Sequence, residues 1–195
     1  MTTAIEEGHL RFEFGNSRSV ERYDGQEGVG KREAHSFYRN RVSKLPETKA
    51  VDFVGLSNPH GASYLIEVKD FRGYRIQNEK RLTTDELARE VAFKVRDSVA
   101  GVVGAKRSYQ EGVLPEAADN LVIPEKDVGV VLWLEDDAAK KADSWKAELA
   151  TLVDKIKAYL SWLTSKILVV SLSTHHYLPP DLKVTNLPGA GQPNP

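Results

Sequence analysis

The chain alternates between short apolar runs and longer segments in which apolar residues recur every three or four positions. Apolar runs of about four to eight residues that are bounded by turn formers indicate β-strands. Four such runs occupy residues 50–54, 64–69, 128–134 and 167–172. Leu10–Phe14 alternates apolar and polar residues and is followed by a turn at 15–17 and by Ser19–Tyr23. Leu10–Phe14 and Ser19–Tyr23 together predict an N-terminal hairpin.

Helical periodicity is found in three segments, residues 31–42, 83–106 and 138–165. Thr83 and Glu86 have the spacing of a capping box, which predicts that the second helix begins at Thr83. The order is then hairpin, helix, strand, strand, helix, strand, helix, strand. This order predicts an α/β layer architecture with a mixed sheet. We expect one domain over residues 1–178, followed by a proline-rich tail over 179–195 that is extended or disordered.

Composition narrows the class of protein. The chain is 41% hydrophobic and 28% charged, as in an ordinary globular domain, and its net charge is only −1. No apolar stretch approaches the roughly 20 residues that a membrane helix needs, so we expect no membrane association. The acidic N-terminus lacks the apolar segment of a secretory signal, which favours a cytoplasmic location. Cysteine is absent, which excludes disulfides and thiolate metal sites.

Three charged residues interrupt the predicted strands at 50–54 and 64–69. Asp52 lies in the first strand, and Glu67 and Lys69 lie in the second. Charged groups within apolar strands are costly unless they are paired or bind a metal. Glu67 and Lys69 are two residues apart, so their side chains share one face of the strand. With a suitable register, Asp52 joins them on that face.

This arrangement favours a site for a hard divalent cation. Two neighbouring carboxylates repel each other unless a cation neutralises them, and Mg²⁺ or Mn²⁺ prefers oxygen ligands. Such a cation lowers the pKa of a bound water and stabilises charge on a phosphoryl oxygen, and Lys69 would orient or deprotonate the water or stabilise the transition state. The alternative is an exposed ion pair between Glu67 and Lys69, with Asp52 capping a turn. The apolar residues on both sides of the three charges disfavour that alternative.

Asp52 followed by Glu67-Val68-Lys69 resembles the motif of the PD-(D/E)XK nuclease superfamily, which includes restriction endonucleases. The resemblance implies a restriction-endonuclease-like αβββαβ core, to which the N-terminal hairpin and the last helix and strand are additions. It implies hydrolysis of phosphodiester bonds that depends on Mg²⁺ or Mn²⁺. It assigns Asp52, Glu67 and the backbone carbonyl of Val68 to the metal, and Lys69 to catalysis. The sequence departs from the motif at Val51, where the family name has proline.

The resemblance also suggests two supporting residues on the predicted helices. A glutamate on the first helix points at the metal in several branches of the superfamily, which suggests Glu33. A lysine or glutamine on the helix after the motif often faces the active site, which suggests Lys94. Each has an ordinary alternative. Glu33 would pair with Lys31 or Arg32 on the surface, and Lys94 would pair with Asp97 three residues on.

Positive charge is concentrated on either side of the motif. Residues 31–49 contain six Lys or Arg against two Glu, and residues 69–81 contain five against two acids. Such segments bind phosphate backbones, although each cation alone is equally typical of a solvated surface. We therefore expect a nucleic-acid partner, DNA in particular. The candidate contacts are Lys31, Arg39, Arg72 and Arg75, with Phe71 or Tyr74 stacking on a base.

Other interpretations remain open at this point. Residues 25–31 match the start of a P-loop, although Arg32 stands where Ser or Thr should hold Mg²⁺. This match would make the chain a nucleotide-binding protein. A catalytically inactive nucleic-acid-binding or assembly subunit of the nuclease fold is the other alternative. The chain has no recognisable DNA-reading module, so specificity would come from this domain, from a homodimer or from a partner protein.

Overall fold

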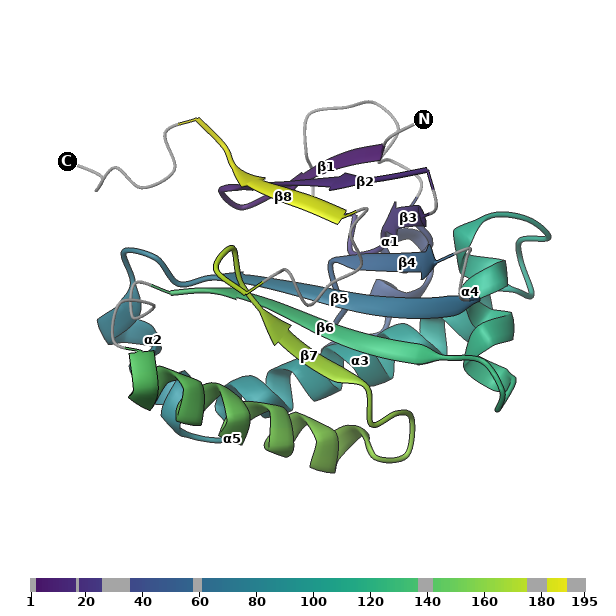
Figure 1. The fold of residues 1–195 in the computed structure, drawn as a ribbon. Helices are drawn as coiled ribbons and strands as arrows, with labels where there is room; N and C mark the ends of the chain where they lie inside the picture. Colours follow the sequence, from purple (N-terminus) through teal and green to yellow (C-terminus); the bar gives the residue numbers. More distant parts are fainter. Residues whose placement is uncertain are drawn as a thin grey trace.

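Two β-sheets and a layer of helices stack on one another in this α/β protein (Figure 1). A computed structural model describes residues 3–16, 18–25, 36–57, 61–136, 142–174 and 182–188. Among these residues, no helix combines the length and the apolar character that are needed to cross a bilayer.

The central sheet has five strands in the order β3-β4-β5-β6-β7. Their bounds are β3 Arg18–Arg22, β4 Phe53–Ser57, β5 Ala62–Asp70, β6 Val128–Glu135 and β7 Ile167–Val170. The first three strands are antiparallel to one another, whereas β5, β6 and β7 are parallel. The apolar runs at 64–69, 128–134 and 167–172 are confirmed as strands, and so is the mixed sheet. The strand predicted over 50–54 instead begins at Phe53, so Asp52 lies one residue before β4 and not within it. Parallel strands are covered on both faces, which explains their continuous apolar character.

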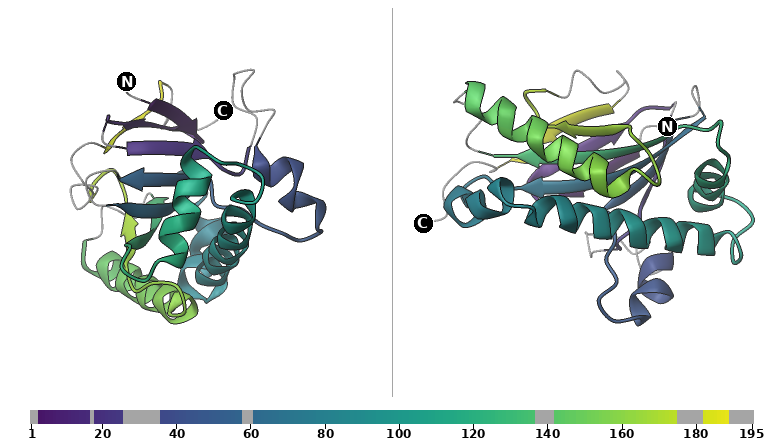
Figure 2. Two further views of the ribbon diagram at one scale, coloured as in Figure 1. Left: turned by 90° about the vertical axis from the view of Figure 1, so that its right-hand side faces the viewer. Right: turned by 90° about the horizontal axis from the view of Figure 1, so that it is seen from below.

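The helices pack on one face of this sheet. They are α1 Phe37–Asn40, the 3₁₀ helix η2 Val42–Lys44, α2 Arg75–Thr83, α3 Glu86–Ala105, α4 Val113–Val122 and α5 Ala142–Leu160. The long helices α3 and α5 lie side by side (Figure 2, right). The predicted capping box is wrong, because Thr83 ends α2. The hydroxyl of Thr84 instead accepts the N–H of Glu86 at 3.3 Å.

A smaller sheet covers the other face. It has the order β1-β2-β8, with β1 Thr3–Glu7, β2 Leu10–Phe14 and β8 Leu182–Asn186. The predicted hairpin is therefore wrong, since β2 pairs with β1 and β8 while β3 joins the central sheet. The predicted domain end at residue 178 is too early. Within the predicted tail, Leu182–Asn186 forms β8, and Leu182 and Val184 are buried in the fold.

The alternation of side chains along β5 separates two cores. Leu65 packs in the core beneath the helices, whereas Ile66 and Val68 pack in the core between the two sheets. Glu67 and Lys69 follow Leu65 at two-residue spacing and therefore face the helices. The strand pattern thus directs the charged residues of the motif toward α3.

Replacing Val184 by serine is expected to destabilise the protein, because Val184 is 5% exposed and packs between the sheets. Loss of apolar contacts and burial of a hydroxyl should lower the free energy of unfolding by about 2 kcal/mol. Urea unfolding followed by circular dichroism measures this loss. The matched control is Lys183→Ser on the exposed side of β8, for which a change below about 0.5 kcal/mol is expected. Equal effects of the two substitutions would contradict the packing of β8.

Candidate functional site

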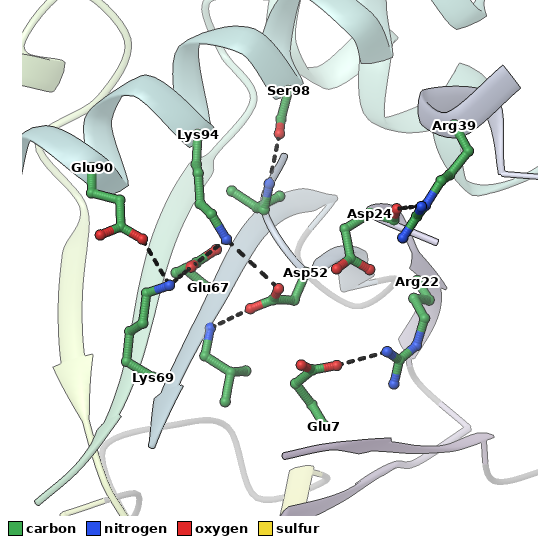
Figure 3. A network of polar contacts seen from close by, with 12 residues as sticks. Glu7, Arg22, Asp24, Arg39, Asp52, Glu67, Lys69, Glu90, Lys94 and Ser98 are labelled. Atoms are coloured by element: carbon green, nitrogen blue, oxygen red, sulfur yellow. Dashed lines mark hydrogen bonds and ion pairs between the residues drawn. The ribbon is translucent and has the colours of Figure 1, made fainter. Parts of the chain in front are cut away.

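Strand register brings the two carboxylates of the motif together. Phe53 pairs with Ile66 across the antiparallel strands β4 and β5, so the preceding Asp52 lies opposite Glu67. The Asp52 carbonyl accepts the N–H of Tyr23 at 2.8 Å, which fixes the backbone just before β4 begins. Both carboxylates face α3 (Figure 3). The expected approach of Asp52 to Glu67 is thus present in the structure.

Two lysines contact the same oxygen of Glu67. The Nζ atoms of Lys94 and Lys69 lie 2.6 Å and 2.8 Å from Glu67 Oε1. Lys94 Nζ is also 3.9 Å from Asp52 Oδ1. The other Asp52 oxygen, Oδ2, accepts the N–H of Val68 at 2.6 Å. Asp52, Glu67, Lys69 and Lys94 therefore form one cluster, and the predicted alternative in which Lys94 pairs with Asp97 is wrong.

Helix α3 supplies further groups at four-residue intervals. Glu90 lies one turn before Lys94 and pairs with Lys69 at 2.8 Å, and it also pairs with Arg81 of α2. Ser98 lies one turn after Lys94, and its hydroxyl accepts the N–H of Val51 at 2.9 Å. Sequence reasoning missed Glu90 and Ser98. The signal that could have found them is their spacing from Lys94, because residues four apart share one face of a helix.

The charge balance of the cluster shifts two pKa values. Burial raises the pKa of Asp52 to about 8, the charge of Glu67 adds to this rise, and Lys94 and the Val68 N–H oppose it. Burial alone would lower the pKa of Lys69, but the carboxylates of Glu67 and Glu90 outweigh it and hold this pKa above its ordinary value. Asp52 in the metal-free protein is therefore largely protonated at neutral pH, whereas Lys69 remains an ammonium.

The donor set fits a hard divalent cation. Glu67 is fully buried, and its Oε2 atom has no hydrogen-bond partner among the described residues. The N–H and C=O of one residue in an antiparallel ladder point to the same neighbour, so the Val68 carbonyl faces the side on which its N–H meets Asp52. These oxygens are of the type that Mg²⁺ and Mn²⁺ prefer. In the described part of the chain, no group of three or more His, Asp or Glu side chains is placed to bind a metal. Mg²⁺ that is held by two carboxylates and one carbonyl would keep several water ligands.

A second polar group borders Asp52 on the side away from α3. Glu7 of β1 accepts a hydrogen bond from Arg22 Nη1 at 2.6 Å, and Asp24 lies nearby (Figure 3). Burial raises the pKa of Glu7, Arg22 opposes this rise, and the charges of Asp24 and Glu67 add to it. No local sequence pattern indicates this group, because β1 belongs to the other sheet.

The remaining predicted residues have different outcomes. Glu33 and Lys31 lie outside the described residues. Arg72 bonds Asp70 through two nitrogens at 2.8 Å and 2.6 Å and donates to Asn186 at 2.6 Å, so it is not brought to the cluster. Arg75 is the first residue of α2, and its side chain lies outside the part of the chain that the structure describes.

The two candidate stacking residues also differ from each other. Phe71 is 4% exposed and packs in the core, so it is not available to a base. Tyr74 is 55% exposed. Only Tyr74 of this pair is therefore accessible from solvent.

An open hollow leads from the surface to the cluster. It has a volume of about 440 Å³, and Arg39 and Ser43 line one side while Glu90 and Lys94 of α3 line the other. Arg39 donates to the carbonyl of Asp24 at 3.1 Å and lines this entrance. Of the predicted nucleic-acid contacts, Arg39 is thus the one that the described structure places beside the site.

The sheet topology counts against the P-loop alternative. The strand that precedes residues 25–31 is β3, which lies at the edge of the sheet and pairs only with the antiparallel β4. A P-loop follows a buried parallel strand. The loop itself falls mostly outside the described residues.

Comparisons of the chain with protein-family models, with curated proteins and with solved structures found no match. The function is therefore inferred from the chemistry of the cluster and from its place in the fold.

Proposed function

We propose that this protein is a divalent-metal-dependent nuclease that hydrolyses phosphodiester bonds in DNA, with a sheet of the PD-(D/E)XK type. The observation that supports this proposal is the buried Glu67 carboxylate. One of its oxygens is shared by Lys69 and Lys94, while the other has no hydrogen-bond partner among the described residues, and the residue lies opposite Asp52. An ion pair alone does not explain why the second oxygen is buried without a donor.

The topology of the sheet agrees with this proposal in most respects. Three antiparallel strands, β3, β4 and β5, are followed by helix α3 and by the parallel strand β6. In this proposal, β3 would correspond to the early strand that the resemblance requires before Asp52. Two departures are present. Helix α1 lies between β3 and β4, whereas the αβββαβ order begins with the helix, and α2 and α4 accompany α3 between β5 and β6, where that order has one helix.

The residues have distinct roles in the proposed reaction. Asp52, Glu67 and the Val68 carbonyl would hold the cation, which supplies Lewis-acid activation of water and neutralises charge on the phosphate. The Lys69 ammonium stabilises negative charge that develops on a phosphoryl oxygen. Ser98 anchors the backbone next to Asp52 and so keeps that carboxylate opposite Glu67.

Incubation of labelled single- and double-stranded DNA with Mg²⁺, Mn²⁺, Ca²⁺ or EDTA tests this function. We expect cleavage with Mg²⁺ and Mn²⁺, and none with EDTA. Ca²⁺ should support binding with little turnover, because its looser coordination positions the water poorly. Asp52→Asn should abolish cleavage while circular dichroism shows a folded protein. Cleavage that persists in EDTA or in Asp52→Asn would refute the proposal.

The second candidate function is a nucleic-acid-binding subunit without catalysis. The observation that favours it is the position of Lys94, whose ammonium contacts Glu67 and approaches Asp52, and so neutralises the carboxylates without a metal. Titration with Mn²⁺ followed by electron paramagnetic resonance separates the two functions. Binding at one site that Asp52→Asn abolishes supports the nuclease, and absence of binding at millimolar Mn²⁺ supports the inactive subunit.

A further inference from the structure

A second hollow adjoins the entrance to the cluster. It has a volume of about 510 Å³ and extends along α3 toward α2. Lys49 and Glu90 line both hollows. The two hollows therefore meet at Glu90, which pairs with Lys69 of the proposed catalytic cluster. Together they form one path across the mouth of the site, which we call the α3 groove.

Basic side chains border the α3 groove. Lys49 and Arg39 lie on one side and Lys80 of α2 lies on the other. None of these three forms an ion pair with a carboxylate among the described residues. The acids of the groove are already engaged, as in the pair between Asp85 and Arg89. The groove thus offers its free positive charge to an anionic ligand.

An exposed aromatic ring lies in the same groove. Phe93 of α3 precedes Lys94 directly and is 44% exposed. Lys49 Nζ lies 6.0 Å from the centroid of its ring, and Arg96 Cζ lies 5.0 Å from it. Aromatic side chains between cations are the platforms on which unpaired bases stack. A base within a duplex is already stacked on its neighbours and does not reach such a ring.

We propose that the α3 groove binds one unpaired DNA strand, with a base stacked on Phe93 and the flanking phosphates on Lys49 and Lys80. This inference rests on the proposed nuclease function, because the strand would then pass over Glu90 and Lys94, which contact Lys69 and Glu67. It names the substrate as single-stranded DNA or the unpaired end of a duplex. A lone exposed phenylalanine is common on protein surfaces, and the two cations and the adjoining cluster set Phe93 apart from that case.

Fluorescence anisotropy with a labelled 12-nucleotide thymidine strand in Ca²⁺ tests the proposal. Phe93→Ala should weaken binding about fivefold or more, because stacking of one base on an aromatic ring has an effect of this size. Trp162→Ala is the matched control, since Trp162 is 57% exposed in the turn after α5 and lines neither hollow. It should change the affinity less than twofold. A strand of abasic residues of the same length should bind wild type and Phe93→Ala equally.

Three outcomes would overturn the inference. The first is an unchanged affinity of Phe93→Ala for the strand. The second is a loss of affinity of Phe93→Ala for a blunt duplex that equals its loss for the strand. The third is tighter binding of the corresponding RNA strand than of the DNA strand. Circular dichroism and urea unfolding of Phe93→Ala show whether the variant is folded, and Phe93→Tyr, which keeps a ring, should retain the affinity.

Cleavage of the same strand by wild-type protein in Mg²⁺ is measured in parallel. If the wild-type protein cleaves the strand and Phe93→Ala binds it with unchanged affinity, only the stacking site is rejected. Binding that depends on Phe93 without any cleavage rejects the nuclease and leaves a strand-binding protein.

Discussion

Replacing Lys69 by methionine is expected to lower the rate of metal-dependent DNA cleavage about 10²- to 10³-fold. The Lys69 ammonium is held by Glu67 and Glu90 at 2.8 Å each, and these contacts hold its pKa above the ordinary value. A lysine that stays protonated cannot take a proton from water. It therefore contributes a fixed positive charge, and removal of one such charge-stabilising group has an effect of this size. Single-turnover rates at saturating Mg²⁺ measure the loss.

Lys69→Arg separates the role of charge from that of proton transfer. Arginine keeps the positive charge but does not deprotonate in proteins. Because we assign an electrostatic role to Lys69, the arginine variant should stay within about tenfold of wild type, as expected for a retained charge with altered hydrogen-bond geometry. Lys183→Met, at an exposed position on β8, controls for loss of a lysine elsewhere and should leave the rate unchanged. An arginine variant as slow as Lys69→Met would instead assign Lys69 the role of general base.

The elements that sequence patterns predicted well are those whose environment is uniform along the element. The runs at 64–69 and 128–134 are strands β5 and β6 because a parallel strand buried on both faces needs apolar residues at nearly every position. The segment 83–106 became α3, with a stripe of apolar residues that packs against the sheet. These patterns are local, and the sequence contains them in full.

The strand pairings that sequence reasoning misassigned depend on partners that are distant in the chain. The local pattern predicts that Leu10–Phe14 pairs with the next strand along the chain. In the structure this segment is β2, and it pairs with β8, which lies more than 160 residues later. Leu182 and Val184 do alternate with polar residues, and that weak signal was hidden among prolines. Helix α2 is mostly polar and shows little apolar periodicity, so it was missed. Its position depends on tertiary contacts such as the pair between Arg81 and Glu90.

The candidate site likewise contains residues that local sequence patterns predict and residues whose place depends on distant parts of the chain. Asp52, Glu67 and Lys69 were predictable because neighbouring antiparallel strands and a spacing of two residues determine which side chains meet. Glu7 was not predictable, since nothing local indicates that β1 passes beside Asp52. The selection of Glu67 rather than Asp97 as the partner of Lys94 depends on the rotation of α3, which its packing against the sheet decides.

Metal binding to the cluster is expected to become tighter with rising pH, up to about pH 8. Burial and the charge of Glu67 raise the pKa of Asp52 to about 8, so Asp52 is largely protonated below this pH. A cation binds the ionised carboxylate and must displace that proton. The apparent affinity for Mn²⁺ should therefore increase by up to about tenfold per pH unit between pH 6 and pH 8, and then level off. Calorimetry in buffers of different ionisation enthalpy should show release of close to one proton per metal at pH 7.

Asp52 gives the stability of the metal-free protein the opposite dependence on pH. Unfolded Asp52 ionises near its ordinary pKa of 3.8, whereas folded Asp52 keeps its proton to about 8. Between these values the folded state binds more protons, so Asp52 makes the free energy of unfolding fall as pH rises, by up to about 1.4 kcal/mol per unit. Comparison with Asp52→Asn isolates this contribution, because asparagine does not titrate and the other buried carboxyls are the same in both proteins. The stability of Asp52→Asn relative to wild type should rise from pH 4 to pH 8 and then stay constant.

Addition of Mn²⁺ should cancel the stability difference between wild type and Asp52→Asn at high pH. Binding of the metal to the folded state alone stabilises wild-type protein, and the cation compensates the repulsion between Asp52 and Glu67. The asparagine variant should gain little from the metal at any pH. If the stability difference between the two proteins were constant from pH 4 to pH 8, Asp52 would titrate as an ordinary carboxyl. The buried pair would then be balanced by Lys94 and Lys69 without a metal, which is the charge distribution expected of the inactive subunit.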